Sequence, residues 1–179
     1  KKNEIIANLS RMNDFLKERG ITGEILLFGG AAIALAFDER RSTKDIDAIF
    51  APVEEIKIAA EKVRIEKKLP DGWLNDAVVK GFVYGSLEKT VVLEMSNLRV
   101  WSPSAEYILA MKITSARADT QDSDDVELLI RHLNIRSYPQ VEKILLKYIP
   151  EAKLTPKSKY FAEEILQKIE DENETSLKI

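Results

Sequence analysis

The residues of this chain best suited to polar chemistry are two aspartates on either side of one isoleucine, Asp45-Ile46-Asp47. Successive side chains of a β-strand point to opposite faces, so a strand here would hold both carboxylates on one face, while Ile46 and Ile49 include core positions on the other. Like charges held this close repel unless a cation lies between them. Mg²⁺ suits such a pair because it prefers oxygen ligands and completes its shell with water and substrate phosphate. The Asp-x-Asp pattern also occurs in ordinary turns, so its meaning depends on the elements around it.

Two adjacent glycines precede the aspartates. Gly29 and Gly30 lie between a short apolar segment, 24–28, and an Ala- and Leu-rich segment, 31–37. Glycines at the junction of a strand and a helix let a ligand approach the backbone, and a helix N-terminus offers unpaired amides with a partial positive charge to a phosphate. For the glycine pair alone, a tight turn is the alternative explanation. The order of strand, glycines, helix and aspartate strand favours a phosphate site next to a metal site.

Composition limits the chemistry that is available. The chain has 179 residues with no Cys and a single His, which excludes disulfides, thiolate metal sites, Cys nucleophiles and His clusters. We expect His132 to have a structural or surface role. The net charge of -3, from 27 Lys and Arg against 30 Asp and Glu, gives no overall electrostatic footprint for nucleic acid. Apolar runs are too short for a membrane span, so we expect a cytoplasmic protein with no membrane partner.

Hydrophobic periodicity and turn residues predict the elements that must position these side chains. The expected helices cover residues 5–19, 31–37, 52–68, 73–80, 105–117, 123–134, 139–148 and 156–169. The expected strands cover residues 24–28, 45–50, 82–84, 90–95 and 97–101. Ser104 is a predicted N-cap, and either Asp122 or Ser123 is expected to cap the helix that follows.

This order of elements predicts an α+β fold. We expect a small mixed β-sheet core with helices over residues 1–102 and a helical region packed on it over residues 103–170. The acidic end, 171–179, is expected to fray.

The segment Phe28-Gly29-Gly30, followed by a helix and by Asp45-Ile46-Asp47, resembles the signature of the nucleotidyltransferase superfamily with the DNA polymerase β-like palm. The resemblance implies Mg²⁺-dependent transfer of a nucleoside monophosphate from an NTP to an acceptor hydroxyl. Asp45 and Asp47 would bind the metal, Gly29 and Gly30 would cradle phosphates, and Thr43 would position a phosphate or a water.

A later segment resembles the pattern of AbiEii-like and MenT-like nucleotidyltransferases, a branch that includes toxin components of toxin–antitoxin systems. The resemblance rests on Leu109-Ala110-Met111-Lys112, Arg117 and Asp122-Ser123-Asp124-Asp125, and it departs at Gln121, where that branch usually has Arg. It implies that Lys112 and Arg117 bind phosphate and that Asp122, or else Asp125, faces the active site. A solvated Lys and helix-capping aspartates are the alternatives from the residues alone.

Many members of the superfamily use a third carboxylate on a neighbouring strand. Glu94 is the acidic residue inside a well-defined predicted strand, so we expect it to be the third metal ligand. Asp76 is the weaker candidate, and an exposed strand Glu is the alternative explanation for Glu94.

Together, these features predict a nucleotidyltransferase whose acceptor is RNA, such as a tRNA end, or a protein hydroxyl, with an antitoxin protein as a further expected partner. The alternative is a catalytically silent relative that binds nucleotide or a partner protein. A glycosyltransferase using Asp-x-Asp would need a longer nucleotide-binding region before the motif, and a purely structural domain would not bind Mg²⁺. Trp101, at the junction of the two halves, is either a core anchor or a residue that borders a nucleotide pocket.

Overall fold

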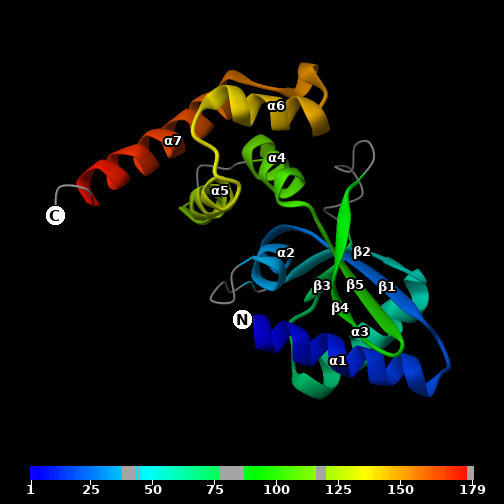
Figure 1. Cartoon of the computed structure of the whole chain (residues 1–179). Helices are drawn as coiled ribbons and strands as arrows, with labels where there is room; N and C mark the ends of the chain where they lie inside the picture. Colours follow the sequence, from blue (N-terminus) through cyan, green and yellow to red (C-terminus); the bar gives the residue numbers. More distant parts are fainter. Residues whose placement is uncertain (38–42, 44, 77–86, 116–119, 177–179) are drawn as a thin grey trace. The chain divides into compact units, whose positions relative to one another are not determined.

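The computed structural model describes residues 1–37, 43, 45–76, 87–115 and 120–176 (Figure 1). By their internal contacts the residues divide into two compact units. Unit 1 consists of residues 1–83 and 88–103, and unit 2 consists of residues 84–87 and 104–179.

Unit 1 is built on a mixed sheet of five strands in the order β3-β2-β1-β5-β4. The strands are β1 (Gly23–Leu27), β2 (Ile46–Ala51), β3 (Leu74–Asn75), β4 (Lys89–Glu94) and β5 (Leu98–Pro103). β1 is antiparallel to β2 and parallel to β5, β2 is parallel to β3, and β4 is antiparallel to β5. A five-stranded mixed sheet with helices, followed by C-terminal helices, confirms the predicted α+β class.

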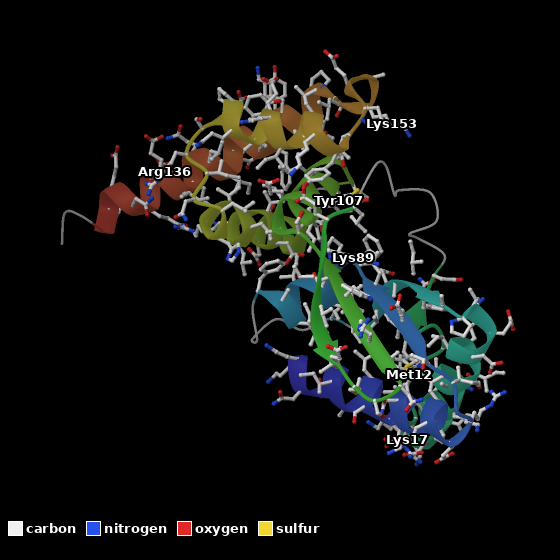
Figure 2. The ribbon with its side chains drawn as sticks, turned by 45° about the vertical axis from the view of Figure 1, so that its right-hand side comes forward. Met12, Lys17, Lys89, Tyr107, Arg136 and Lys153 are labelled. Carbon is white, nitrogen blue, oxygen red and sulfur yellow. The ribbon has the colours of Figure 1, made fainter. Side chains whose placement is uncertain are left out.

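One face of this sheet is buried under α1 (Lys2–Glu18) and α3 (Val53–Lys67). A Cβ atom at Gly23 would lie 2.6 Å from a methyl group of Ile56 on α3 and 3.2 Å from one of Leu16 on α1, so Gly23 marks the covered face. Ile25 and Leu27 lie two and four residues after Gly23, so they share its face of the sheet, and both are fully buried. Figure 2 shows the buried Met12 on the sheet side of α1, with Lys17 reaching outward from the same helix. We call the opposite face, which carries Glu24 and Leu26, the open face.

Two sequence expectations about the sheet are wrong. Ile49 was expected to lie in the core, on the face opposite the aspartates. Instead Ile46 and Ala48 point to the covered face, while Ile49 shares the open face with Asp47 and is 37% exposed. The helix expected over 73–80 is also not formed at its start, because Leu74–Asn75 is strand β3. The Ile46 amide donates to the Trp73 carbonyl at 2.7 Å and thereby begins that pairing.

Helix α2 (Gly29–Ala36) follows β1 and precedes β2 in the chain. Five consecutive residues, Ala31 to Leu35, are buried, because the helix packs against α1, β2 and β5. Small alanines allow this close packing on more than one side, which fixes the position of the first turn of α2.

Unit 2 contains α4 (Ala105–Ser115), α5 (Thr120–His132), α6 (Tyr138–Tyr148), the 3-10 helix η1 (Glu151–Lys153) and α7 (Pro156–Ser176). Ser104 caps α4 as predicted, since its hydroxyl accepts from the Tyr107 amide at 3.2 Å. Asp122 is not an N-cap, because α5 begins at Thr120. Helix α7 continues past Ile169, where the predicted helix ended, and includes most of the acidic end.

Among the described helices, none combines the length and apolar character that a membrane crossing requires.

Candidate active site

The first turn of α2 requires both of its glycines. Gly29 has a φ of +55°, in the left-handed region that disfavours residues with a Cβ atom. Gly30 faces Thr43, because a Cβ atom placed at Gly30 would lie 3.3 Å from both Cβ and Oγ1 of Thr43. The missing side chain at Gly30 therefore lets Thr43 approach the backbone of this turn closely, and the first amides of a helix have no acceptor within the helix.

The two aspartates lie directly beside this turn. A Cβ atom at Gly29 would lie 3.4 Å from Oδ2 of Asp47, and the Phe28 amide donates to the Asp47 carbonyl at 2.8 Å. The Thr43 hydroxyl donates to the Asp45 carbonyl at 2.9 Å and lies 3.4 Å from Oδ1 of Asp45. Asp45 is exposed and Asp47 is half-buried. The structure thus brings the predicted phosphate residues and the predicted metal residues to one end of the sheet.

Asn75 is a neighbour of this group that the sequence did not single out. In the parallel pairing of β2 with β3, Asn75 is the partner of Asp47, so the two side chains share the open face. Asp76, the next residue, instead has a carboxylate oxygen 3.6 Å from the Lys57 ammonium on α3. The available signal was the polar pair Asn75-Asp76 shortly after the buried Trp73, but it was recognisable only once β3 was known to pair with β2.

The prediction that Glu94 completes this site does not fit the geometry. Glu94 lies on β4, three strands away from β2. Its register partner on β5 is Arg99, and the row continues through Glu24 on β1 to Ala51 on β2. Three strand spacings of about 4.8 Å and four residues of about 3.3 Å separate Glu94 from Asp47 in the two directions of the sheet. The Glu94 carboxylate instead accepts from the Arg99 guanidinium, with Nε at 2.9 Å.

The donor set at the glycine turn fits a hard divalent cation. It offers two carboxylates, with the Asn75 side chain as their neighbour on the same face. Within the part of the chain that the structure describes, no three His, Cys, Asp or Glu side chains converge on one point. Mg²⁺ does not need three, because it is usually held by one or two carboxylates together with water and substrate phosphate.

Unit 2 contains a second group of predicted residues. The Lys112 ammonium on α4 lies 2.7 Å from Oδ1 of Asp122 and 2.8 Å from Oδ2 of Asp125, both on α5. The side chains are 16%, 19% and 1% exposed in that order, so the cluster is largely withdrawn from water. A Lys ammonium has three N–H donors, and two of them point to these carboxylates. We call these three residues the lysine cluster.

The lysine cluster holds its cation firmly. Burial is the largest single influence on the Lys112 pKa and lowers it, but the hydrogen bonds and charges of Asp122 and Asp125 together outweigh burial. The net pKa of Lys112 is therefore raised above its ordinary value. The ammonium stays charged at neutral pH and joins α4 to α5.

Arg117, the other predicted phosphate ligand, lies outside the described residues, so its role stays a prediction. The same holds for the departure at Gln121, whose side chain is not described. The aspartate pair belongs to unit 1 and the lysine cluster to unit 2.

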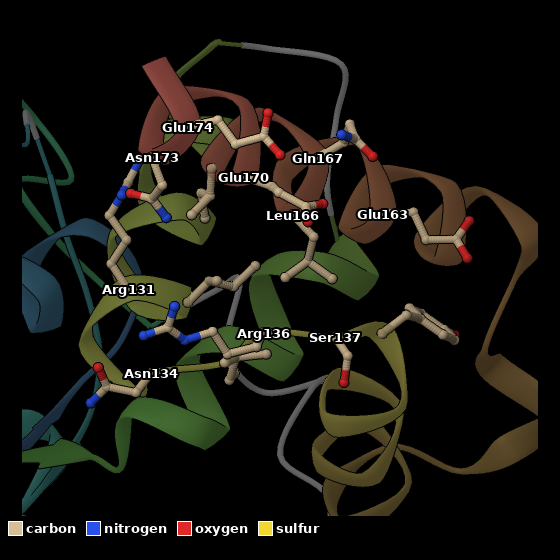
Figure 3. A pocket seen from close by; sticks show the side chains of 14 residues that line it. Arg131, Asn134, Arg136, Ser137, Glu163, Leu166, Gln167, Glu170, Asn173 and Glu174 are labelled. Atoms are coloured by element: carbon tan, nitrogen blue, oxygen red, sulfur yellow. The ribbon is translucent and has the colours of Figure 1, made fainter. Parts of the chain in front are cut away.

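A groove of unit 2 is lined by none of the predicted site residues that the structure describes. It measures about 810 Å³ and lies between the end of α5, the start of α6 and α7 (Figure 3). Arg131 and Arg136 project into it from one side, and Glu163, Glu170 and Glu174 line it from α7 (Figure 3). Its mixed charges give it no preference for a polyphosphate.

Comparison with known proteins places this geometry in a family. Residues 4–160 match the family described as "Nucleotidyltransferase of unknown function (DUF6036)". Searches of curated proteins and of solved structures give no match. The family match carries no assignment to the AbiEii-like or MenT-like branch, which stays a prediction. Because the match extends from α1 into α7 and includes both the aspartate pair and the lysine cluster, the chain belongs to this nucleotidyltransferase family.

Proposed function

We propose that this protein transfers a nucleoside monophosphate from an NTP to the hydroxyl of an acceptor, in a site formed by Gly29, Gly30, Asp45 and Asp47. The observation that supports it is the contact between the two motifs, with the Asp47 carboxylate 3.4 Å from where a Gly29 side chain would begin. Family membership implies the NTP substrate. The assay below identifies the nucleobase and shows whether the acceptor is RNA or protein.

Each residue of the site has a distinct task in this proposal. The first-turn amides of α2 bind the phosphates of the NTP, and the missing side chains at Gly29 and Gly30 let those phosphates reach the backbone. Asp45 and Asp47 would hold Mg²⁺, with Asn75 as an added oxygen donor from β3. When bound, Mg²⁺ neutralises phosphate charge and acidifies a coordinated hydroxyl. Thr43 fixes the conformation of Asp45 through its hydrogen bond to the Asp45 carbonyl.

The bond changes define the reaction. The acceptor oxygen forms a bond to the α-phosphorus, and the bond from that phosphorus to the bridging oxygen breaks. Pyrophosphate leaves with the electron pair, and the acceptor proton passes to solvent. Because little covalent chemistry falls to the protein, positioning and electrostatics supply most of the rate.

The lysine cluster is assigned to the same reaction by resemblance. Two N–H groups of Lys112 are directed to Asp122 and Asp125, and in this proposal the third donates to a phosphate oxygen. Asp122 acts as a positioning residue in this proposal, because it orients the ammonium. Arg117 is proposed to contact phosphate as well.

The test is an incubation with each labelled NTP, Mg²⁺, total cellular RNA and total protein. Label is expected in one acceptor fraction, with release of pyrophosphate. Asp47→Asn is expected to lower transfer about 100-fold or more, since removing one preorganised electrostatic group costs this much in other enzymes. Asp71→Asn is the matched control, because that carboxylate is 91% exposed and lies on a turn.

Two outcomes would contradict the proposal. Undiminished transfer by an Asp45→Asn, Asp47→Asn double variant would remove the aspartate pair from the mechanism. NTP binding by the wild-type protein without any pyrophosphate release would favour the catalytically silent alternative.

The resemblance to AbiEii-like and MenT-like proteins further supports a toxin role, which we propose for the same activity. Induced expression is then expected to arrest growth, and Asp47→Asn is expected to relieve the arrest. Equal arrest by both proteins would separate toxicity from the transferase site.

A further inference from the structure

An apolar row crosses the open face of the sheet next to the proposed site. Ile49 on β2 is the register partner of Leu26 on β1, Leu26 is the partner of Trp101 on β5, and Trp101 is the partner of Val91 on β4. Register partners share a face, so the four side chains form one continuous line. Ile49 is 37% and Val91 41% exposed, and the two central residues are half-buried. We call this line the apolar row.

Two cations lie over the aromatic member of the row, and Lys89 is closer to it than Arg99, whose guanidinium carbon lies 5.7 Å from the centre of the Trp101 ring. The Lys89 ammonium lies 4.5 Å from the centre of the Trp101 ring. Figure 2 shows Lys89 at the start of β4, two residues before Val91. Because β2 and β4 run in the same direction, Lys89 and Asp47 lie on the same side of the apolar row.

On the other side of the row, positive and negative side chains neutralise one another. Arg99 is held by Glu94, and its Nη1 lies 3.9 Å from Oε1 of Glu24. This arginine therefore adds no net positive charge to the face. The charge that can attract a phosphate lies at the Asp47 side, where Lys89 is placed.

We infer that the apolar row binds the unpaired bases of a single-stranded nucleic acid acceptor, with Trp101 as the stacking residue and Lys89 as the contact to its backbone phosphate. The inference rests on the proposed function, because it identifies the acceptor of that site. An aromatic side chain beside a cation on an open sheet face is the combination that binds single strands without sequence preference. The row spans three strand spacings, about 14 Å, which exceeds the single base that a free NTP would place there.

The test measures RNA binding apart from catalysis. A fluorescein-labelled single-stranded RNA about 10 nucleotides long, within the usual site size for such surfaces, is titrated with the full chain over a range of salt concentrations. Trp101→Leu keeps apolar packing but removes the stacking ring, and it is expected to weaken binding about 10-fold. Lys89→Ala is expected to reduce the slope of log K against log salt by about 0.7, the value for one phosphate contact on a single strand.

Matched variants guard against indirect effects. Lys62→Ala removes a cation that also lies over an aromatic ring, 5.0 Å from the centre of Phe15, but on the helices that cover the other face. It is expected to change neither affinity nor slope. Trp101→Phe keeps a smaller ring and is expected to restore part of the affinity lost in Trp101→Leu, which separates stacking from a loss of folding.

The outcomes distinguish this inference from the proposed function. Asp47→Asn is expected to bind the RNA normally while failing to transfer label. The inference is overturned if the wild-type protein does not bind the RNA, or if the Trp101 and Lys89 variants bind it as tightly as wild type. Either result counts even if NTP transfer to a protein acceptor proceeds. Displacement of the RNA from Trp101 by ATP alone would also overturn it, because the row would then belong to the NTP pocket.

Discussion

The molecule contains two pairs of carboxylates that differ in how their charge is balanced. Asp45 directly precedes β2 and Asp47 lies on it, whereas Asp122 and Asp125 lie three residues apart on helix α5. Asp122 and Asp125 enclose the Lys112 ammonium, and Asp125 is 1% exposed. Asp45 is exposed, and Oδ2 of Asp47 lies 3.4 Å from where a Gly29 side chain would begin.

This difference gives the lysine cluster a structural task besides its proposed contact with phosphate, whereas the proposed task of the aspartate pair is binding. A buried carboxylate is tolerated only with a cation beside it, so Lys112 stabilises the junction of α4 with α5. The aspartate pair lies where Gly29 and Gly30 leave room for a ligand, and a charged ligand can complete it. The predictions below test the contrast by removing charge from one pair and then from the other.

The largest expected effect is on the lysine cluster. Lys112→Met should lower the free energy of unfolding by about 3 to 5 kcal/mol, because it leaves the buried Asp125 charge without its cation. Urea unfolding followed by circular dichroism measures this loss. Lys168→Met is the control and should lose far less, since that cation is 50% exposed in its pair with Glu127. A loss as small as the control's would show that the cluster does not hold unit 2 together.

The aspartate pair should respond to metal instead. At a Mg²⁺ concentration ten times its dissociation constant, binding should stabilise the protein by about 1.4 kcal/mol, equivalent to about 4 °C in the melting temperature. Tryptophan fluorescence measures the shift in unit 1, which contains both tryptophans, Trp73 and Trp101. Asp47→Asn should abolish the shift, and Asp122→Asn should retain it. The reverse result would move the metal to the lysine cluster.

The two pairs should also differ in their response to alkali. Because the Lys112 pKa is raised in the folded state, its contribution to stability is complete below the ordinary value of 10.5 and is lost as the pH rises through the higher folded pKa. The difference in urea midpoint between wild type and Lys112→Met should therefore stay constant from neutral pH up to the ordinary Lys pKa of 10.5 and shrink as the pH rises above it. A difference that does not change with pH would argue against an ionic cluster.

The smallest effect is expected at Glu94. Glu94→Gln breaks an exposed pair with Arg99 and should cost less than about 1 kcal/mol. Affinity for Mg²⁺, measured by the same thermal shift, should not change, because three strand spacings separate Glu94 from β2. A clear loss of Mg²⁺ affinity would return Glu94 to the metal site.

Much of the fold could be predicted because the relevant signals are local. Apolar periodicity, Gly20 and Ser104 indicated the extents of α1 and α4, and short apolar runs indicated β1 and β2. β3 could not be predicted, because a strand of two residues carries no periodicity of its own. It forms through pairing with β2, and its misassignment also hid Asn75.

The third carboxylate shows the same limit at the site. Glu94 was chosen because it lies in a clear strand, but strand order and register are properties of long-range pairing. Likewise, the spacing of Ile49 from Ile46 did not reveal that Ile49 belongs to the open face and to the apolar row.

Residue types and short-range order were enough to predict the chemistry that we propose for this protein. The absence of Cys, the single His, the adjacent glycines and the alternating aspartates favour phosphate and hard-metal chemistry, and those features are local in the chain. The tertiary structure decided which residues share a site. Strand pairing placed Asn75 beside Asp47, removed Glu94 from it and aligned Trp101 with Ile49, while helix packing placed Lys112 between two carboxylates. These contacts join residues far apart in the chain, so only the folded backbone specifies them.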